Sequence, residues 1–314
     1  MVPQALHALP SRDDETRGLS LGLLGVAIFA LTLPMTRMAV GPAEAPQLPP
    51  LFVTSGRAGF AGLLSIVYLL ALRAPWPRRT QLAAFAVSAL GTVVGFPLFL
   101  ALALRHVDAM HAAVVTGLLP LATAVAAALW LRQRPSAGFW ACAVAGCALV
   151  VAFALLRGSG RLSLADALLL GAVASAAVGY VAGARLAAQM PAEQVICWVL
   201  VLSLPVTLPA TMAVWPTAPV RTISWAAFGY TALFSMWLGF FAWYRGLALG
   251  GTVRVSQVQL VQPFLSLLAA VPLLGEHLDA ATVAFSLAVI ATVFLGKKMP
   301  THRPNRIQRT GEKP

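Results

Sequence analysis

The chain has 314 residues, of which 59% are hydrophobic and only 10% are charged. A soluble domain has about 25% charged residues, so this composition excludes an ordinary soluble protein. The net charge of +12 would favour nucleic-acid binding only if the basic residues gathered on one soluble face. They lie instead between and after hydrophobic runs, so we expect no nucleic-acid partner. The composition predicts an all-α membrane protein.

Ten stretches of the chain are long and apolar enough to cross a bilayer as helices, which requires about 20 residues each. Clusters of proline, glycine and arginine separate them, and the segment RGSGR at 157–161 divides the chain near its middle. The predicted spans are 19–40, 50–72, 81–104, 109–131, 137–156, 164–186, 193–214, 223–244, 252–274 and 279–298.

The distribution of lysine and arginine predicts the orientation of these spans, because cytoplasmic loops carry an excess of both. With the N-terminus in the cytoplasm, inner segments hold 16 of the 22 basic residues, outer segments hold five, and Arg57 lies within a span. The N-terminal tail carries Asp13, Asp14 and Glu15 and does not resemble a cleaved signal peptide. We expect both termini to be cytoplasmic, in a bacterial inner (plasma) membrane.

The stretches 109–133 and 252–276 share one design, which indicates an internal repeat. A shift of 143 residues aligns Pro120 with Pro263 and gives ten identities over the 43 positions that start at residue 109. Each copy would hold five helices, and an odd number of helices reverses the membrane orientation of the second copy. Inverted repeats are typical of transporters whose substrate site lies near the bilayer midplane.

The sequence therefore predicts ten transmembrane helices arranged as two inverted five-helix repeats. A duplicated scaffold without transport is the alternative. The predicted domains are a cytoplasmic tail at 1–18, a first repeat at 19–156, a second repeat at 164–298 and a basic cytoplasmic tail at 299–314.

The second copy places a polar face on an otherwise apolar helix. At about 100° per residue its polar side chains fall on one side, while Gln257 points elsewhere. Such a face is costly in lipid and should meet other helices or a wet cavity. The face consists of Ser256, Gln259, Gln262, Pro263 and Ser266, and the shift aligns Thr116 with Gln259 and Thr123 with Ser266.

Several of these segments resemble the EamA-type drug/metabolite transporter family. Pro120 and Pro263 stand in the fourth helix of each half, as in that family. The segment 275–278, GEHL, is similar to its G-E-x-hydrophobic ending, and 54–60, TSGRAGF, is similar to its second helix, where an arginine precedes an aromatic residue.

One segment departs from the family pattern. In the first half, Arg132-Gln133-Arg134-Pro135 replaces the Gly-Glu pair, which leaves the role of Gln133 open. The resemblance covers about residues 19–298. It implies two five-helix repeats and a transporter of small organic metabolites, often an exporter.

Arg57 is the sharpest candidate for substrate binding. A charge about seven residues into a span is costly unless it is paired, hydrated or able to reach the interface. It could receive a carboxylate or phosphate of a substrate, or it could snorkel to the outer interface.

The other candidates come from the repeat and from the aromatic residues. The polar residues could line a pocket or bond helix to helix, a mid-span tryptophan could stack on a flat solute, and the two prolines could act as hinges or be tolerated breaks. The candidates for substrate binding are Thr116, Thr123, Gln259, Gln262, Ser266 and Trp237, and those for hinges are Pro120 and Pro263.

The predicted function is a secondary transporter that exports small organic metabolites, such as amino acids or related compounds, by alternating access around a central cavity. An intramembrane enzyme would need HExxH, GxSxG or a pair of intramembrane carboxylates, and the chain has none, so we expect no enzyme. No cysteine spacing indicates a metal site, and we expect no cofactor.

The sequence leaves several properties open. A non-transporting regulatory or scaffold membrane protein remains the alternative function. The expected partners are a small-molecule substrate and membrane lipid, and a homodimer is left open. No Asp or Glu falls in the middle of a predicted span, so neither a coupling ion nor the solute is identified.

Overall fold

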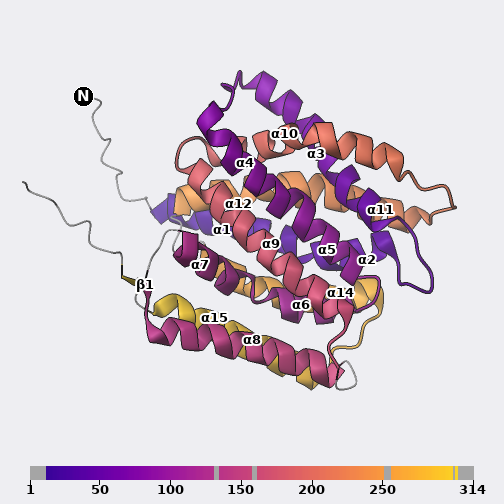
Figure 1. The fold of residues 1–314 in the computed structure, drawn as a ribbon, viewed down its shortest axis with the longest axis vertical. Helices are drawn as coiled ribbons and strands as arrows, with labels where there is room; N and C mark the ends of the chain where they lie inside the picture. The colour runs from indigo at the N-terminus through magenta and orange to yellow at the C-terminus, as the bar shows by residue number, and fades with distance from the viewer. Residues whose placement is uncertain (1–11, 131–133, 158–160, 251–255, 300, 303–314) are drawn as a thin grey trace, which may run out of the picture.

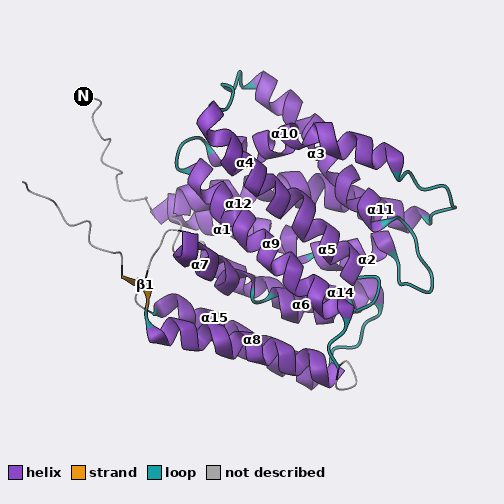
Figure 2. Cartoon of the chain, in the orientation of Figure 1, coloured by secondary structure: helices purple, strands orange, loops and turns teal. Residues whose placement is uncertain are grey.

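The computed structural model describes residues 12–130, 134–157, 161–250, 256–299 and 301–302. Nearly all of this part of the chain is helical, as Figure 2 shows. The two strands among these residues, β1 (Arg134–Pro135) and β2 (Thr301–His302), have two residues each and pair antiparallel.

The first half of the chain forms helices up to Arg157. Many predicted spans are built from two or three consecutive helical segments. The segments of the first half are α1 (Arg12–Ala30), α2 (Thr32–Val40), α3 (Pro50–Ala71), η1 (Arg79–Gln81), α4 (Leu82–Ser88), η2 (Ala89–Gly95), α5 (Phe96–Ala103), α6 (Ala109–Thr116), α7 (Leu119–Trp130) and α8 (Ala137–Arg157).

The second half repeats this organisation from Leu164 onward. Its segments are α9 (Leu164–Ala187), α10 (Ala192–Ala213), α11 (Thr222–Tyr230), η3 (Thr231–Leu238), α12 (Gly239–Gly250), η4 (Ser256–Val261), α14 (Gln262–Leu274) and α15 (Ala280–Lys298).

Eight helical stretches are long and apolar enough to cross a membrane, and each overlaps one of the first eight predicted spans. In the last two predicted spans the apolar helical stretches among the described residues, Val258–Leu274 and Ala280–Gly296, have fewer than 18 residues, although α15 itself runs from Ala280 to Lys298, close to the predicted 279–298. The start of the ninth predicted span, 252–255, lies outside the described residues. The eight long stretches are Asp13–Val40, Pro50–Ala71, Arg79–Ala103, Ala109–Trp130, Ala137–Arg157, Leu164–Ala187, Ala192–Ala213 and Thr222–Gly246.

The first helix begins earlier than its hydropathy predicts. Asp13, Asp14 and Glu15 lie in the first turn of α1, where negative side chains stabilise the free N–H groups and the positive end of the helix dipole. Residues that we assigned to a tail therefore extend the helix beyond the apolar stretch.

Local side chains also set several helix boundaries. Gly41 ends α2 at φ +68° and Gly275 ends α14 at φ +69°, a backbone conformation that glycine adopts without strain. Asp279 begins α15 by accepting a hydrogen bond from the Thr282 backbone N–H at 2.8 Å. Gly275 and Asp279 together fix the tight connection between α14 and α15.

The helices pack in pairs that join the two halves of the chain. α1 packs on α12, α3 on α10, α8 on α15, α6 on α14, and α9 on the segments η2 and α5. In Figure 1 the α8–α15 pair lies along one edge of the bundle and the α3–α10 pair along the opposite edge. The helices that surround the centre come from both halves.

Glycines let two of these pairs approach at backbone distance. A Cβ atom on Gly91 would lie 2.4 Å from the Ser175 carbonyl oxygen and 2.7 Å from the Gly179 Cα, so η2 and α9 touch backbone to backbone. On the other side, a Cβ on Gly246 of α12 would lie 2.7 Å from the Gly22 nitrogen of α1. Small residues at such contacts are typical of helix packing in membranes.

Candidate substrate cavity

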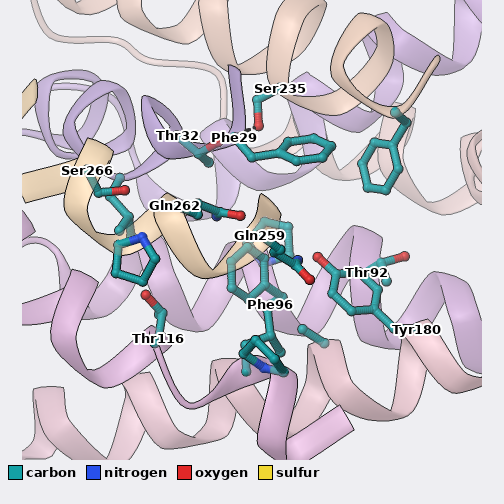
Figure 3. Close-up of a pocket in the computed structure, with 18 of the residues that line it drawn as sticks. Phe29, Thr32, Thr92, Phe96, Thr116, Tyr180, Ser235, Gln259, Gln262 and Ser266 are labelled. Carbon is teal, nitrogen blue, oxygen red and sulfur yellow. Dashed lines mark hydrogen bonds between the residues drawn. The ribbon is translucent and has the colours of Figure 1, made fainter. Parts of the chain in front are cut away.

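A cavity of about 80 Å³ lies at the centre of the bundle, between the two halves. Figure 3 shows Gln259 and Gln262 in the middle of it, between Thr32 and Ser235 on one side and Phe96 on the other. Ligand pockets usually measure about 300–1,000 Å³, so the cavity must widen before it can hold a metabolite. In its present form it has room for a few water molecules.

Residues related by the internal repeat meet in this cavity. A shift of 143 residues, which aligns the fourth spans of the two halves, also relates many of the lining residues to one another. The cavity therefore lies on the boundary between two equivalent structures. The related lining pairs are Leu33 and Ala176, Thr92 and Ser235, Pro97 and Phe240, Thr116 and Gln259, Gly117 and Leu260, Leu119 and Gln262, and Pro120 and Pro263.

The helices are broken at equivalent positions beside the cavity. α6 ends at Thr116 and α7 begins at Leu119, with Pro120 in its first turn. In the second half, the 3₁₀ segment η4 ends at Val261 and α14 begins with Gln262 and Pro263. Proline fits the first turn of a helix because the missing N–H would have no partner there. Both breaks lie where we predicted hinges, and the hinge role itself stays a prediction.

A second matched irregularity was not visible in the sequence. η2 (Ala89–Gly95) and η3 (Thr231–Leu238) are both π-helical, and the shift of 143 residues brings them into register. Such segments are rare and lie frequently at functional sites. Here each supplies one hydroxyl side chain, Thr92 or Ser235, to the cavity wall.

Arg57 is held inside the bundle by a short chain of hydroxyl groups. Its Nη2 donates to the Ser235 Oγ at 3.0 Å, and that oxygen lies 2.8 Å from the Thr32 Oγ1. Only 3% of the Arg57 surface is exposed, and its Nε and Nη1 are buried without a partner among the described residues. Arg57 therefore does not snorkel to an interface, which was the alternative interpretation.

Most of the residues predicted for substrate binding do line the cavity. Arg57, Thr116, Gln259, Gln262 and Ser266 all contribute to its wall. Thr116 also donates to the Ala112 carbonyl at 2.8 Å, and Ser266 donates to the Ala30 carbonyl at 2.8 Å, which joins α14 to α1. Solute binding by these side chains is still a prediction.

Two predicted binding residues lie elsewhere. Thr123 donates to the Leu119 carbonyl of its own helix at 2.8 Å, so its hydroxyl is satisfied without a cavity. Trp237 donates from its indole nitrogen to the Ser65 Oγ at 3.1 Å, and its ring lies 4.7 Å from that of Phe241. Neither residue is among those lining the cavity, so we do not include them in the proposals below.

Several lining residues were missed by the sequence analysis. Thr32, Thr92 and Ser235 are small hydroxyl residues within predicted spans, and Tyr180 is an aromatic residue that was not among our candidates. The repeat held a usable signal, because the same shift relates Thr92 to Ser235.

Glu276 fastens one end of the first half to the second. Its two carboxylate oxygens accept hydrogen bonds from the backbone nitrogens of Ala109 and Met110, at 2.7 and 2.8 Å. These are free N–H groups in the first turn of α6, so the loop after α14 caps the helix that crosses it. Nearby, the His111 Nε2 lies 2.7 Å from the Asp166 Oδ1 and joins α6 to α9.

Burial raises the pKa of Glu276 above its ordinary value. The two backbone hydrogen bonds and Arg37 act in the opposite direction, whereas the nearby Asp108 raises the pKa further. A carboxyl group with a raised pKa in the folded state stabilises the fold most at low pH, and this contribution is lost as the pH rises through the folded-state pKa.

We expect this linkage to appear as a pH-dependent difference between the wild type and Glu276→Gln. The amide of the variant replaces one of the two hydrogen-bond acceptors, which lowers the stability by the same amount at every pH. The amide does not titrate. The melting temperature of the wild type minus that of the variant should be larger at about pH 4.5 than at about pH 7.5. Glu44→Gln, at an exposed position, should show no such trend. A difference that does not change with pH would contradict the assignment.

Among the described residues, no group of three or more His, Cys, Asp or Glu side chains is placed to hold a metal ion. The described residues that line the cavity offer hydrogen bonding, aromatic contact and the positive charge of Arg57.

Known proteins share this architecture. A family model described as the EamA-like transporter family matches residues 16–156 and again residues 163–296. The chain belongs to the EamA-like transporter family. The resemblance inferred from the proline, GEHL and TSGRAGF segments is thereby confirmed.

Individual relatives agree with this membership. The transporter is 44% identical over 294 residues to a Bacillus subtilis (strain 168) protein named "Uncharacterized transporter YdeK", an alignment that covers 91% of this chain and 99% of the relative. It also matches a crystal structure with a TM-score of 0.58 and 21% identity, over 89% of this chain and 98% of that one. At this identity the second match shows the fold alone. The chain is an integral membrane protein of a transporter family.

Proposed function

We propose that this protein is a secondary transporter that exports small organic metabolites, among them amino acids or related compounds, by alternating access. The observation that carries the proposal is the central cavity walled by repeat-related residues from both halves. Two equivalent halves that meet at one site can exchange their roles, so that the site opens first to one side and then to the other.

The packing of the helices supports two inverted repeats. If the halves are exchanged, the α1–α12 pair becomes the pair that α9 forms with η2 and α5, while α3–α10 and α8–α15 each map onto themselves. Ten spans, with the shorter Val258–Leu274 and Ala280–Gly296 as the last two, give five per half. The excess of basic residues on inner segments supports cytoplasmic termini in a bacterial inner membrane.

The size of the cavity supports a conformational cycle. At about 80 Å³ it excludes metabolites as it stands. The helix breaks at Pro120 and Pro263 are adjacent to the cavity in both halves, so movement there would change its volume symmetrically.

A transport assay with purified protein tests this proposal. We expect vesicles containing the transporter to release members of a broad panel of labelled metabolites faster than vesicles without protein. Replacing Gln259 by Leu removes a hydrogen-bonding group from the wall and should lower the rate about tenfold, the equivalent of one lost hydrogen bond. Gln194→Leu, on α10 outside the cavity, should match the wild type. If no metabolite moves in any direction, the proposal is wrong.

A further inference from the structure

The charge that the described residues bring to the cavity wall is positive. Among the described residues that line the cavity, Arg57 alone is charged, and no carboxylate contributes to the wall. An arginine side chain keeps its proton in proteins, so burial does not remove this charge. Any solute that enters the widened cavity meets a fixed positive group.

The Arg57 guanidinium is incompletely satisfied. The Ser235 hydroxyl is the hydrogen-bond partner of Nη2, at 3.0 Å, while Nε and Nη1 are buried with no partner in the described part of the chain. The ion pairs found among the described residues involve Arg37, His111 and Arg157, and not Arg57. A buried ion without a counter-ion is strongly unfavourable, and an incoming anion would relieve that penalty.

The rest of the wall suits an organic body rather than a second charge. Phe29, Phe96, Phe240 and Tyr180 offer aromatic surface, and Gln259 and Gln262 offer neutral amides. An ammonium group would lose its hydration here without meeting a carboxylate among the described lining residues, so a zwitterion is disfavoured relative to a simple anion.

The geometry points to a monoanionic organic acid as the cargo, with its carboxylate or phosphate oxygens bound by the free N–H groups of Arg57. This inference rests on the proposed transport function and narrows the class of solute. The carboxylate of an amino acid can bind Arg57, but its ammonium group finds no carboxylate among the described lining residues. An aromatic or apolar acid without an ammonium group matches both the charge and the apolar wall.

The charge of the cargo also bears on the energetics of export. The interior of a bacterial cell is electrically negative, and the membrane potential therefore drives a free anion outward. Export of a monoanion requires no coupling ion, which agrees with a cavity wall that carries no carboxylate in the described residues.

A charge series on one carbon skeleton tests the inference. We would measure binding to the purified full-length protein of 3-phenylpropionate, phenylalanine, 3-phenylpropylamine and 3-phenylpropionamide, with methyl phenyl phosphate, a monoanionic phosphodiester, added to separate phosphate from carboxylate recognition. We expect one of the two anions to bind at least tenfold more tightly than the zwitterion, the cation and the neutral amide. Equal binding of phenylalanine, or binding of neither anion, would overturn the inference.

Variants of Arg57 provide the second arm. Arg57→Gln should remove the preference for the anion, and Arg57→Lys, which keeps the charge, should retain part of it. Arg221→Gln, at an exposed arginine, should behave as the wild type. The ligand series is measured on the wild type, so it tests the inference even if the Arg57→Gln variant does not fold.

Transport from vesicles distinguishes a failure of the anionic cargo from a failure of the proposed transport function. Efflux of the anion should accelerate with an inside-negative potential and slow when the potential is reversed. If vesicles release zwitterions and not anions, the transporter stands and the anionic cargo is wrong. If they release no solute of any charge, the proposed function fails.

Discussion

Gly91→Ala should abolish a stable fold. Its added Cβ would lie 2.4 Å from the Ser175 carbonyl oxygen and 2.7 Å from the Gly179 Cα, and both are backbone atoms that cannot rotate away. Separating η2 from α9 would disturb the pair that borders the cavity. Overpacking typically costs about 1–3 kcal/mol, and we expect this clash to lie at or above the upper end because it is between backbone atoms. We expect the variant to lose most of its yield as a single species in detergent and to melt well below the wild type.

A second glycine provides the matched control. A Cβ on Gly229 of α11 would meet nothing within 4 Å. Gly229→Ala should therefore be neutral or slightly stabilising, because alanine favours the helix by about 1 kcal/mol. Equal melting temperatures of the two variants would show that η2 and α9 are not in backbone contact.

Ala176→Phe should block transport in a protein that still folds. Ala176 is fully buried on α9 and borders the central cavity. A phenyl ring there would fill a space that now holds about 80 Å³ and would keep a solute from reaching Arg57. We expect release of any transported solute to fall to the level of protein-free vesicles, with some loss of stability from the added volume.

The neighbouring alanine makes this prediction specific. Ala177 faces a different space, an apolar groove of about 600 Å³ between α7, α8 and α9. Ala177→Phe adds the same ring to the same helix, and transport should stay within about twofold of the wild type because the groove has room for it. If both variants lose transport equally, the central cavity is not the solute path.

The sequence predicted the helices of this fold well because hydropathy reports directly on burial in lipid. Its errors lie where other forces decide. The N-terminus of α1 extends to Arg12 because acidic residues stabilise a helix end. This effect is not visible in an average over apolar residues.

The cavity was harder to predict than the helices. The polar face of Gln259 and Gln262 indicated that something other than lipid lies opposite, and both residues line the cavity. The same reasoning selected Thr123, whose hydroxyl is satisfied by the Leu119 carbonyl. Trp237 was selected as a mid-span aromatic residue that could stack on a solute, but its indole nitrogen donates to Ser65. A sequence shows that a polar group needs a partner, but the partner is fixed only by three-dimensional packing.

The π-helical segments were beyond the reach of the sequence analysis. No hydropathy pattern distinguishes an extra residue in a helical turn from a regular helix. Nevertheless η2 and η3 position Thr92 and Ser235, and Ser235 is the partner of Arg57. Comparing the halves residue by residue over the third and eighth spans would have related Thr92 to Ser235, though not the backbone irregularity itself.

The central cavity has room for only a few water molecules, which has a consequence for affinity measurements. A solute can bind only to the fraction of molecules in which the cavity has widened, so the apparent dissociation constant equals the intrinsic constant divided by that fraction. If wide forms made up about one molecule in a hundred, a micromolar site would appear about a hundredfold weaker. Substitutions that favour the wide form would then strengthen apparent binding without touching any residue that contacts the solute.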